Sequence, residues 1–124
     1  MAAYALAHLR TPQINAEVLE YIERIQATMD PFGGRFLVHG ATVEVIEGSW
    51  PGTVVILEFP DAEAARTWYA SAAYQDILPL RTNNIVGDTI IVDGVPPNYD
   101  AAHTAAVLRR SAVPEGSQAE PRSA

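Results

Sequence analysis

The sequence predicts a single α+β domain in which a four-stranded antiparallel sheet is covered by helices on one face. Short apolar or alternating runs, typical of strands, are separated by longer segments whose apolar residues recur at helical spacing. Their order along the chain is strand, helix, strand, strand, helix, strand. The chain has 124 residues, which is long enough to bury one hydrophobic core.

The chain opens with a predicted strand over residues 4–9, which ends before a Thr-Pro pair. Strand alternation places Tyr4, Leu6 and His8 on one face. The opposite face carries Ala5, Ala7 and Leu9. Because alanine is so common on that second face, we expect a helix to pack closely against it.

A helix is predicted from Asn15 to about Met29. Its apolar residues follow helical spacing and are Val18, Ile22, Ile25 and Met29. Asn15 is a suitable N-cap, because its side chain can accept a hydrogen bond from the first turn. The segment Asp-Pro-Phe-Gly-Gly at residues 30–34 ends the helix.

The second strand is predicted over residues 35–39. Alternation places Phe36 and Val38 on one face, and on the other face Arg35, Leu37 and His39. Gly40 marks a bulge or a break before a further extended piece, Thr42 to Glu47.

The third strand is predicted over residues 53–59, after a Ser-Trp-Pro-Gly turn, and it leads to a helix N-cap at Asp61. The apolar stripe of this helix comprises Ala62, Ala65, Trp68 and Tyr69. Ser71 can cap a second short helix, which Pro79 should end or kink because proline cannot donate the helical hydrogen bond.

The last strand is predicted over residues 87–93, and the composition changes after it. Residues 1–95 are therefore expected to form the domain, and residues 96–124 a C-terminal extension. The extension is expected to contain a short helix at about 100–110. Its polar end, from about residue 112, is expected to be disordered.

This order of elements is the split β-α-β arrangement of the ferredoxin-like fold. Helices cover only one face of such a sheet, whereas the strands here are apolar on both faces, most clearly in Val54–Leu57 and Ile90–Val92. An uncovered apolar face must meet another surface. We therefore expect a homodimer in which the open sheet faces of two copies enclose a cavity, the dimeric α/β barrel.

Composition excludes several classes of function. The formal net charge is −7 and all eight basic residues are scattered arginines, so a nucleic-acid surface is not expected. The absence of cysteine excludes disulfides, a thiolate nucleophile and thiolate metal sites. The N-terminus lacks the pattern of a signal peptide, and no run is long enough to span a membrane. We expect a soluble, cytoplasmic protein with no membrane or nucleic-acid partner.

Several motifs in the right order resemble the DUF1330 family of small bacterial proteins. They are Gly-Gly-Arg-Phe-Leu-Val-His-Gly from Gly33, Val-Glu-Val-Ile-Glu-Gly-Ser-Trp from Val43, Val-Ile-Leu-Glu-Phe-Pro-Asp from Val55, Ala-Ala-Arg-Thr-Trp-Tyr from Ala64, Ser-Ala-Ala-Tyr-Gln from Ser71 and Pro-Leu-Arg from Pro79. The resemblance covers about residues 3–94 and implies the dimeric α/β-barrel fold and a homodimer. Relatives by fold include cofactor-free monooxygenases, muconolactone isomerases and haem-dependent chlorite dismutases, so the fold does not define a reaction.

The two strand histidines, His8 and His39, are the candidate catalytic residues. If the first two strands run parallel on either side of the third, both histidines lie toward the same end, about 10 Å apart by strand spacing. In that position they could line one pocket, where a histidine can act as a general base near neutral pH. The alternative is a hydrogen-bonded or partly solvated histidine without a catalytic role.

Arg35 and Glu58 are candidate ligand-binding residues toward the other end of the sheet. They either form a cross-strand ion pair, the favoured interpretation, or Arg35 binds a ligand carboxylate with both of its terminal nitrogens. Trp50, in the turn, is expected at a cavity or a dimer contact. Arg81, which the family's Pro-Leu-Arg motif implies, either anchors its helix to the sheet or points into the cavity.

Aromatic residues offer a further pocket wall, since Trp68, Tyr69 and Tyr74 follow one another along the second helical region. Their helical spacing favours a core position for the first two. Three scattered histidines show no metal-ligand spacing, and no phosphate-binding or dinucleotide motif is present. We therefore expect no metal and no cofactor.

Together these observations predict a homodimer that binds a small apolar or anionic metabolite. No residue pattern identifies a reaction, and cofactor-free isomerase or monooxygenase activity is the hypothesis for an enzyme. The alternative is a non-enzymatic ligand carrier or structural dimer. A third hypothesis is haem binding, which the fold relatives suggest.

Overall fold

The structure, a computed structural model, describes residues 1–10 and 13–112. In chain order its elements are β1 (Ala3–Arg10), α1 (Ala16–Met29), the 3₁₀ helix η1 (Asp30–Phe32), β2 (Arg35–His39), β3 (Thr53–Phe59), α2 (Ala62–Ala70), α3 (Ala72–Thr82), β4 (Val86–Asp93) and α4 (Ala101–Ser111). The predicted α+β order is confirmed, and α2 and α3 are the two helices expected after Asp61 and Ser71. The predicted disordered end falls almost entirely outside the described residues.

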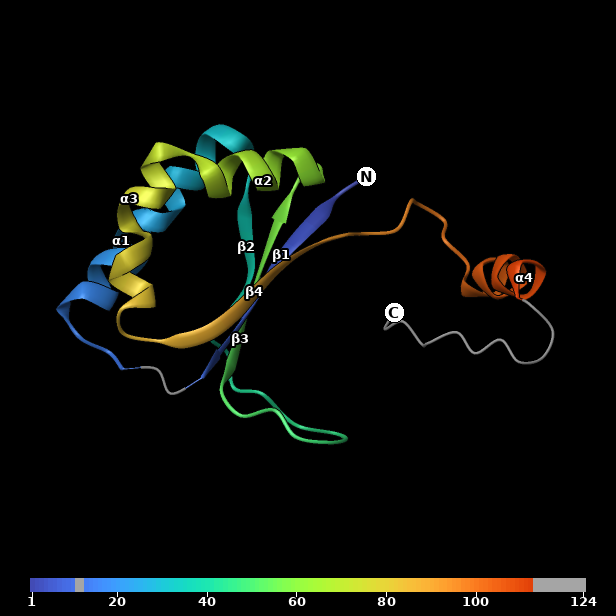
Figure 1. The fold of residues 1–124 in the computed structure, drawn as a ribbon, viewed down its shortest axis with the longest axis horizontal. Helices are drawn as coiled ribbons and strands as arrows, with labels where there is room; N and C mark the ends of the chain where they lie inside the picture. The colour runs from blue at the N-terminus through green and yellow to red at the C-terminus, as the bar shows by residue number, and fades with distance from the viewer. Residues whose placement is uncertain (11–12, 113–124) are drawn as a thin grey trace.

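The four strands form one sheet in the order β2-β3-β1-β4, and every neighbouring pair is antiparallel. β1 and β2 consequently run parallel to each other on either side of β3, as predicted. Helices α1, α2 and α3 lie on one side of this sheet (Figure 1). This arrangement is the ferredoxin-like fold.

Small residues on β1 allow the helices to approach the sheet closely. Ala3 and Ala5 are buried beneath them, in a core that includes Ile25, Phe59 and Trp68. The Gly-Gly pair that ends η1 is part of the same packing. A methyl group at Gly34 would lie 2.4 Å from the ring of Phe59, so only glycine fits there.

Capping residues set the boundaries of the helices. The side chain of Asn15 accepts a hydrogen bond from the backbone of Val18, which confirms it as the N-cap of α1. Asp61 and Ser71 cap α2 and α3 in the same way. Of the two effects predicted for Pro79, ending the helix is wrong, because α3 continues to Thr82. Pro79 lies in the second half of the helix, and its carbonyl accepts a hydrogen bond from Asn83 (3.0 Å).

The alternation of β2 is interrupted by a β-bulge at Leu37, between Phe36 and Val38. One extra residue exchanges the faces of all residues after it. His39 therefore lies on the same, helix-covered face as Phe36, and the two rings stack with centroids 4.4 Å apart. The prediction that His39 shares a face with Arg35 is corrected.

The extended piece expected at Thr42–Glu47 is not a strand. β2 ends at His39, and the chain then enters a loop that projects from the sheet before β3 begins at Thr53 (Figure 1). Gly40 has a positive φ of 75°, which turns the backbone out of the sheet. Loop residues from 41 to 52 are mostly exposed.

The second face of the sheet is open, and no helix of the described residues covers it. In the strand register its apolar side chains are Leu6, Val54, Ile56, Ile90 and Val92. Ile90 and Val92 are 56% and 46% exposed. An apolar sheet face of this kind is a surface that another surface normally covers.

No helix in the described part of the chain is long and apolar enough to cross a bilayer.

Candidate functional site

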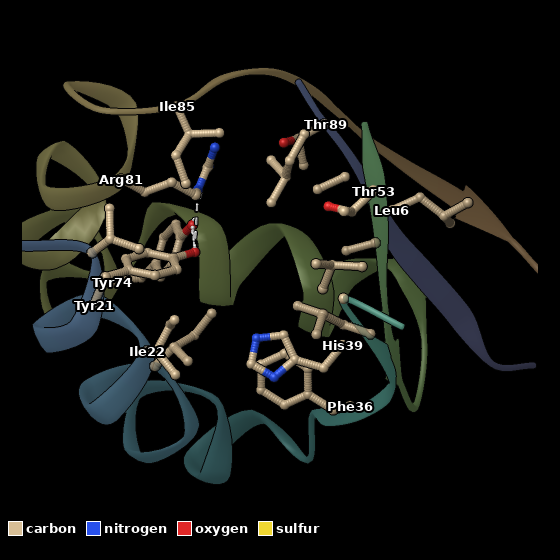
Figure 2. Close-up of a pocket in the computed structure, with 18 of the residues that line it drawn as sticks. Leu6, Tyr21, Ile22, Phe36, His39, Thr53, Tyr74, Arg81, Ile85 and Thr89 are labelled. Atoms are coloured by element: carbon tan, nitrogen blue, oxygen red, sulfur yellow. Dashed lines mark hydrogen bonds between the residues drawn. The ribbon is translucent and has the colours of Figure 1, made fainter. Parts of the chain in front are cut away.

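A pocket of about 400 Å³ lies within one chain, between the helix-covered face of the sheet and helices α1 and α3. Its lining is mainly apolar, and Figure 2 shows side chains from the sheet on one side of the space and from the helices on the other. The polar groups that reach it are few, and they come from Tyr21, His39, Thr53, Tyr74, Arg81 and Thr89. This composition is typical of a site for a small organic molecule.

The most unusual of these groups is the guanidinium of Arg81, on α3. Arg81 is only 7% exposed, yet it takes part in none of the ion pairs among the described residues. Instead, Nε donates a hydrogen bond to the hydroxyl of Tyr21 (3.3 Å), and a terminal nitrogen donates to that of Tyr74 (3.5 Å). A buried cation normally has a carboxylate partner. Arg81 has none among the described residues, so the positive charge at this site has no anion from that part of the chain.

Arg81 is positively charged at neutral pH. Burial acts to lower the pKa of its guanidinium, but Tyr21 and Tyr74 act to raise it, and the pKa lies above its usual value. The guanidinium also lies beside the ring of Tyr21, with its central carbon 5.6 Å from the ring centroid.

The two tyrosines form a neutral support for this charge. Their hydroxyl oxygens are 2.7 Å apart, within hydrogen-bonding distance. Burial raises the pKa of Tyr21, and Tyr74 raises it further, so the Tyr21 phenol keeps its proton. Because neutral hydroxyls accept hydrogen bonds but do not neutralise charge, Arg81 can still attract an anion.

Trp68 forms part of the pocket wall and is fixed by a hydrogen bond. Its indole nitrogen donates to the hydroxyl of Thr28 (2.9 Å), and its ring contacts that of Tyr74 with centroids 4.2 Å apart. The wall of Trp68 and Tyr74 is therefore rigid and aromatic. The prediction of a core position is confirmed for Trp68, which lines the pocket as well, and is wrong for Tyr69, which is 37% exposed.

His39 reaches the pocket from the sheet side because of the bulge in β2. Figure 2 shows its imidazole beside Phe36, across the space from the helices that carry Tyr21 and Arg81. Within the described part of the chain, no hydrogen bond engages its ring nitrogens. The imidazole is thus available to a molecule in the pocket.

His8 lies on the open face of the sheet, so the two histidines do not share a pocket. Its ring stacks on Trp50, with centroids 4.2 Å apart, and its Nε2 donates a hydrogen bond to the carbonyl of Pro51 (2.5 Å). The expectation that His8 and His39 line one cavity is therefore wrong. The cause is the bulge in β2, which exchanges the face of His39 and leaves His8 on β1 unaffected.

Arg35 and Glu58 form the predicted cross-strand ion pair, 2.7 Å between nitrogen and oxygen, on the open face. Tyr4 donates a hydrogen bond to the same carboxylate (3.4 Å). Neither Arg35 nor Glu58 lines the pocket. Of the predicted catalytic and ligand-binding residues, His39 and Arg81 line the pocket, together with Trp68 and Tyr74 of the predicted aromatic wall.

The sequence reasoning missed Tyr21. Its spacing from Val18 and Ile25 places it on the buried stripe of α1, and all three residues are buried. A tyrosine in a buried stripe needs a partner for its hydroxyl, and that requirement could have indicated a polar group inside the core.

No group of three or more histidine, aspartate and glutamate side chains in residues 1–10 and 13–112 lies close enough together to hold a metal ion.

Residues 2–95 match the family described as domain of unknown function DUF1330. The chain belongs to this family. α4 lies beyond the matched residues. No functionally curated protein matches the sequence.

Solved structures support the fold at low sequence identity. The RPA0582 protein of unknown function from Rhodopseudomonas palustris is 16% identical with a TM-score of 0.60, covering 77% of this chain and 84% of that one. A mutant of SnoaB, a cofactor-independent oxygenase from Streptomyces nogalater, is 13% identical with a TM-score of 0.55, covering 80% and 98%.

Because no carboxylate of the described residues pairs with Arg81, we expect that removing its charge does not destabilise the folded protein. Replacing Arg81→Met keeps the side-chain volume, removes a buried charge and leaves the two tyrosine hydroxyls paired. We expect the free energy of unfolding of the ligand-free protein to be unchanged or to rise by about 1–2 kcal/mol, measured by urea denaturation. Ile77→Met, at a buried position of the same helix, is the control. A large loss of unfolding free energy in Arg81→Met, without a similar loss in Ile77→Met, would show that Arg81 is a structural residue.

Proposed function

We propose that this protein is a homodimer that binds a small, mainly apolar organic anion in the pocket of each chain. Arg81 binds the anionic group, and the aromatic wall of Trp68, Tyr74 and Phe36 contacts the apolar part. The observation that carries the proposal is the buried, charged guanidinium of Arg81, which has no carboxylate partner in the part of the chain that the structure describes. A planar carboxylate suits it, because guanidinium can donate two parallel hydrogen bonds to such a group.

The size and shape of the pocket limit the ligand. A cavity of about 400 Å³ is within the range of small-molecule sites. Its few polar groups lie apart on the helix side and the sheet side. The ligand class that fits is therefore an aromatic or alicyclic carboxylate with a second polar atom within reach of His39.

Affinity for matched aromatic probes tests this assignment. We expect 2-naphthoate to bind the protein and Arg81→Met to weaken that binding by about tenfold or more, since a charged hydrogen-bond partner is lost. The neutral 2-naphthamide should bind both proteins equally. Isothermal titration calorimetry gives the affinities, with exposed Arg66→Met as the control. Equal losses for naphthoate and naphthamide would contradict the role of Arg81.

The homodimer is supported by the open face of the sheet. Leu6, Ile56 and Ile90 form an apolar surface there, and a second copy presents the same surface. The two faces would then be buried together. The ion pair of Arg35 and Glu58 lies at one end of this face, and the stacked His8 and Trp50 lie at the other.

Substitution on the open face tests the dimer. We expect native mass spectrometry to show a dimer for the wild-type protein and a monomer for Ile90→Glu, because a buried unpaired carboxylate is strongly unfavourable. Leu19→Glu, on an exposed position of α1, is the control and should leave the dimer intact. A dimer that survives Ile90→Glu would show that copies associate through another surface.

His39 supports a second candidate function, cofactor-free proton transfer on the bound anion. Its imidazole can accept a proton from a carbon or hydroxyl of the ligand, while Arg81 stabilises the negative charge that develops. SnoaB, on the same fold, is a cofactor-independent oxygenase. Because the two sequences are only 13% identical, this similarity supports the fold alone. The proposal of proton transfer rests on the positions of His39 and Arg81 in the pocket.

Deuterium exchange distinguishes an enzyme from a carrier. For a ketone-bearing aromatic carboxylate that binds, such as phenylpyruvate, we expect protein-catalysed exchange of the acidic C–H in D₂O, followed by NMR. His39→Gln should slow this exchange by about 100-fold without weakening binding. Binding without any exchange would favour the non-enzymatic carrier.

A further inference from the structure

Helix α4 stands apart from the rest of the chain. It begins with Asp100, whose side chain accepts a hydrogen bond from the backbone of Ala102 (3.0 Å), and it lies away from the sheet and the other helices (Figure 1). An isolated helix of eleven residues has marginal stability in water. Its stable formation therefore requires a surface to pack on.

The C-terminal half of α4 combines apolar and basic side chains. Val107 and Leu108 are 38% and 63% exposed. They are followed directly by Arg109 and Arg110, in the last turn. The complementary surface is therefore apolar with acidic side chains at its edge.

The loop between β2 and β3 has this chemistry. Val45 and Ile46 are 47% and 81% exposed, and Glu44 and Glu47 flank them. The apolar pair on α4 can therefore pack on the apolar pair of the loop. The basic residues beside the first pair are then close to the acidic residues beside the second.

Within one chain these two segments lie at opposite ends of the sheet. α4 follows the end of β4 at Asp93, which pairs with Ala3, whereas the loop leads into Thr53, which pairs with Leu9. The length of β1 between Ala3 and Leu9 is about 20 Å. The helix and the loop of the same copy are therefore poorly placed to meet.

A second copy on the open face removes this separation when the two-fold axis crosses the strands. A two-fold axis that lies between the sheets and crosses the strands reverses strand direction, so the α4 end of one copy lies over the loop end of the other. Packed sheets are about 10 Å apart. The connection from residue 94 to residue 100 can extend about 20 Å, which is enough to reach the partner.

We propose that α4 packs on the loop at residues 41–52 of a second copy of this chain, with two such contacts in each dimer. Val107 and Leu108 contact Val45 and Ile46 of the partner copy, and the two arginines pair with the two loop glutamates. This inference rests on the homodimer of the proposed function and adds a segment that the family match does not include.

Reciprocal charge reversal in the full-length protein tests the contact. We expect Arg109→Glu with Arg110→Glu to raise the dimer dissociation constant by about tenfold, measured by sedimentation over a series of concentrations. Glu44→Arg with Glu47→Arg should have a similar effect. Combining all four changes should return the dissociation constant to within about threefold of the wild-type value. Leu108→Asp, which removes the apolar half of the contact, should also weaken the dimer.

The control for net charge combines the two arginine reversals with Glu23→Arg and Glu63→Arg, on exposed positions of α1 and α2. This variant has the same net charge as the variant with all four changes at the contact. Its dimer dissociation constant should stay raised. A dimer whose dissociation constant is unchanged by the reversals and by Leu108→Asp would overturn the α4 contact alone, as would rescue by the control. A monomeric wild-type protein would overturn the proposed dimer and this contact together.

Discussion

The pocket depends on the buried positive charge of Arg81, which no carboxylate of residues 1–10 and 13–112 pairs with. The hydroxyls of Tyr21 and Tyr74 accept hydrogen bonds from Arg81, but a hydroxyl group carries no charge, so the positive charge of the guanidinium is not compensated. An ordinary core would place an apolar side chain at this position. The arrangement is reasonable if the missing negative charge belongs to a ligand that enters the pocket between the sheet and the helices.

The sheet serves two purposes because its two faces differ. Small residues such as Ala3 and Ala5 let the helices pack closely at one end of the helix-covered face, and the pocket forms where this packing is less close. The bulge at Leu37 adds His39 to that pocket. The open face keeps its own polar pairs, including Arg35 with Glu58, and presents an apolar surface suited to a second copy.

Much of the fold could be predicted from the sequence, because strand alternation, helical spacing and capping residues such as Asn15 are local signals. The bulge could not, since Leu37 is apolar and fits either face of a strand. Regular alternation would place His8 and His39 on the same face. The extra residue at Leu37 is the reason that they lie on opposite faces. Arg81 was identified through a family motif, whereas its position inside the pocket depends on how α3 packs against Tyr21 of α1, a contact between residues far apart in the chain.

The location of a bound carboxylate shows whether Arg81 is the anion-binding group of the pocket. A crystal structure with 4-bromobenzoate would locate the bromine by its anomalous scattering and the carboxylate by its density. We expect the carboxylate to bind the guanidinium of Arg81 and the bromine to lie against the aromatic wall inside one chain. A bromine between the open sheet faces of two copies, with Arg81 bound only to Tyr21 and Tyr74, would contradict it.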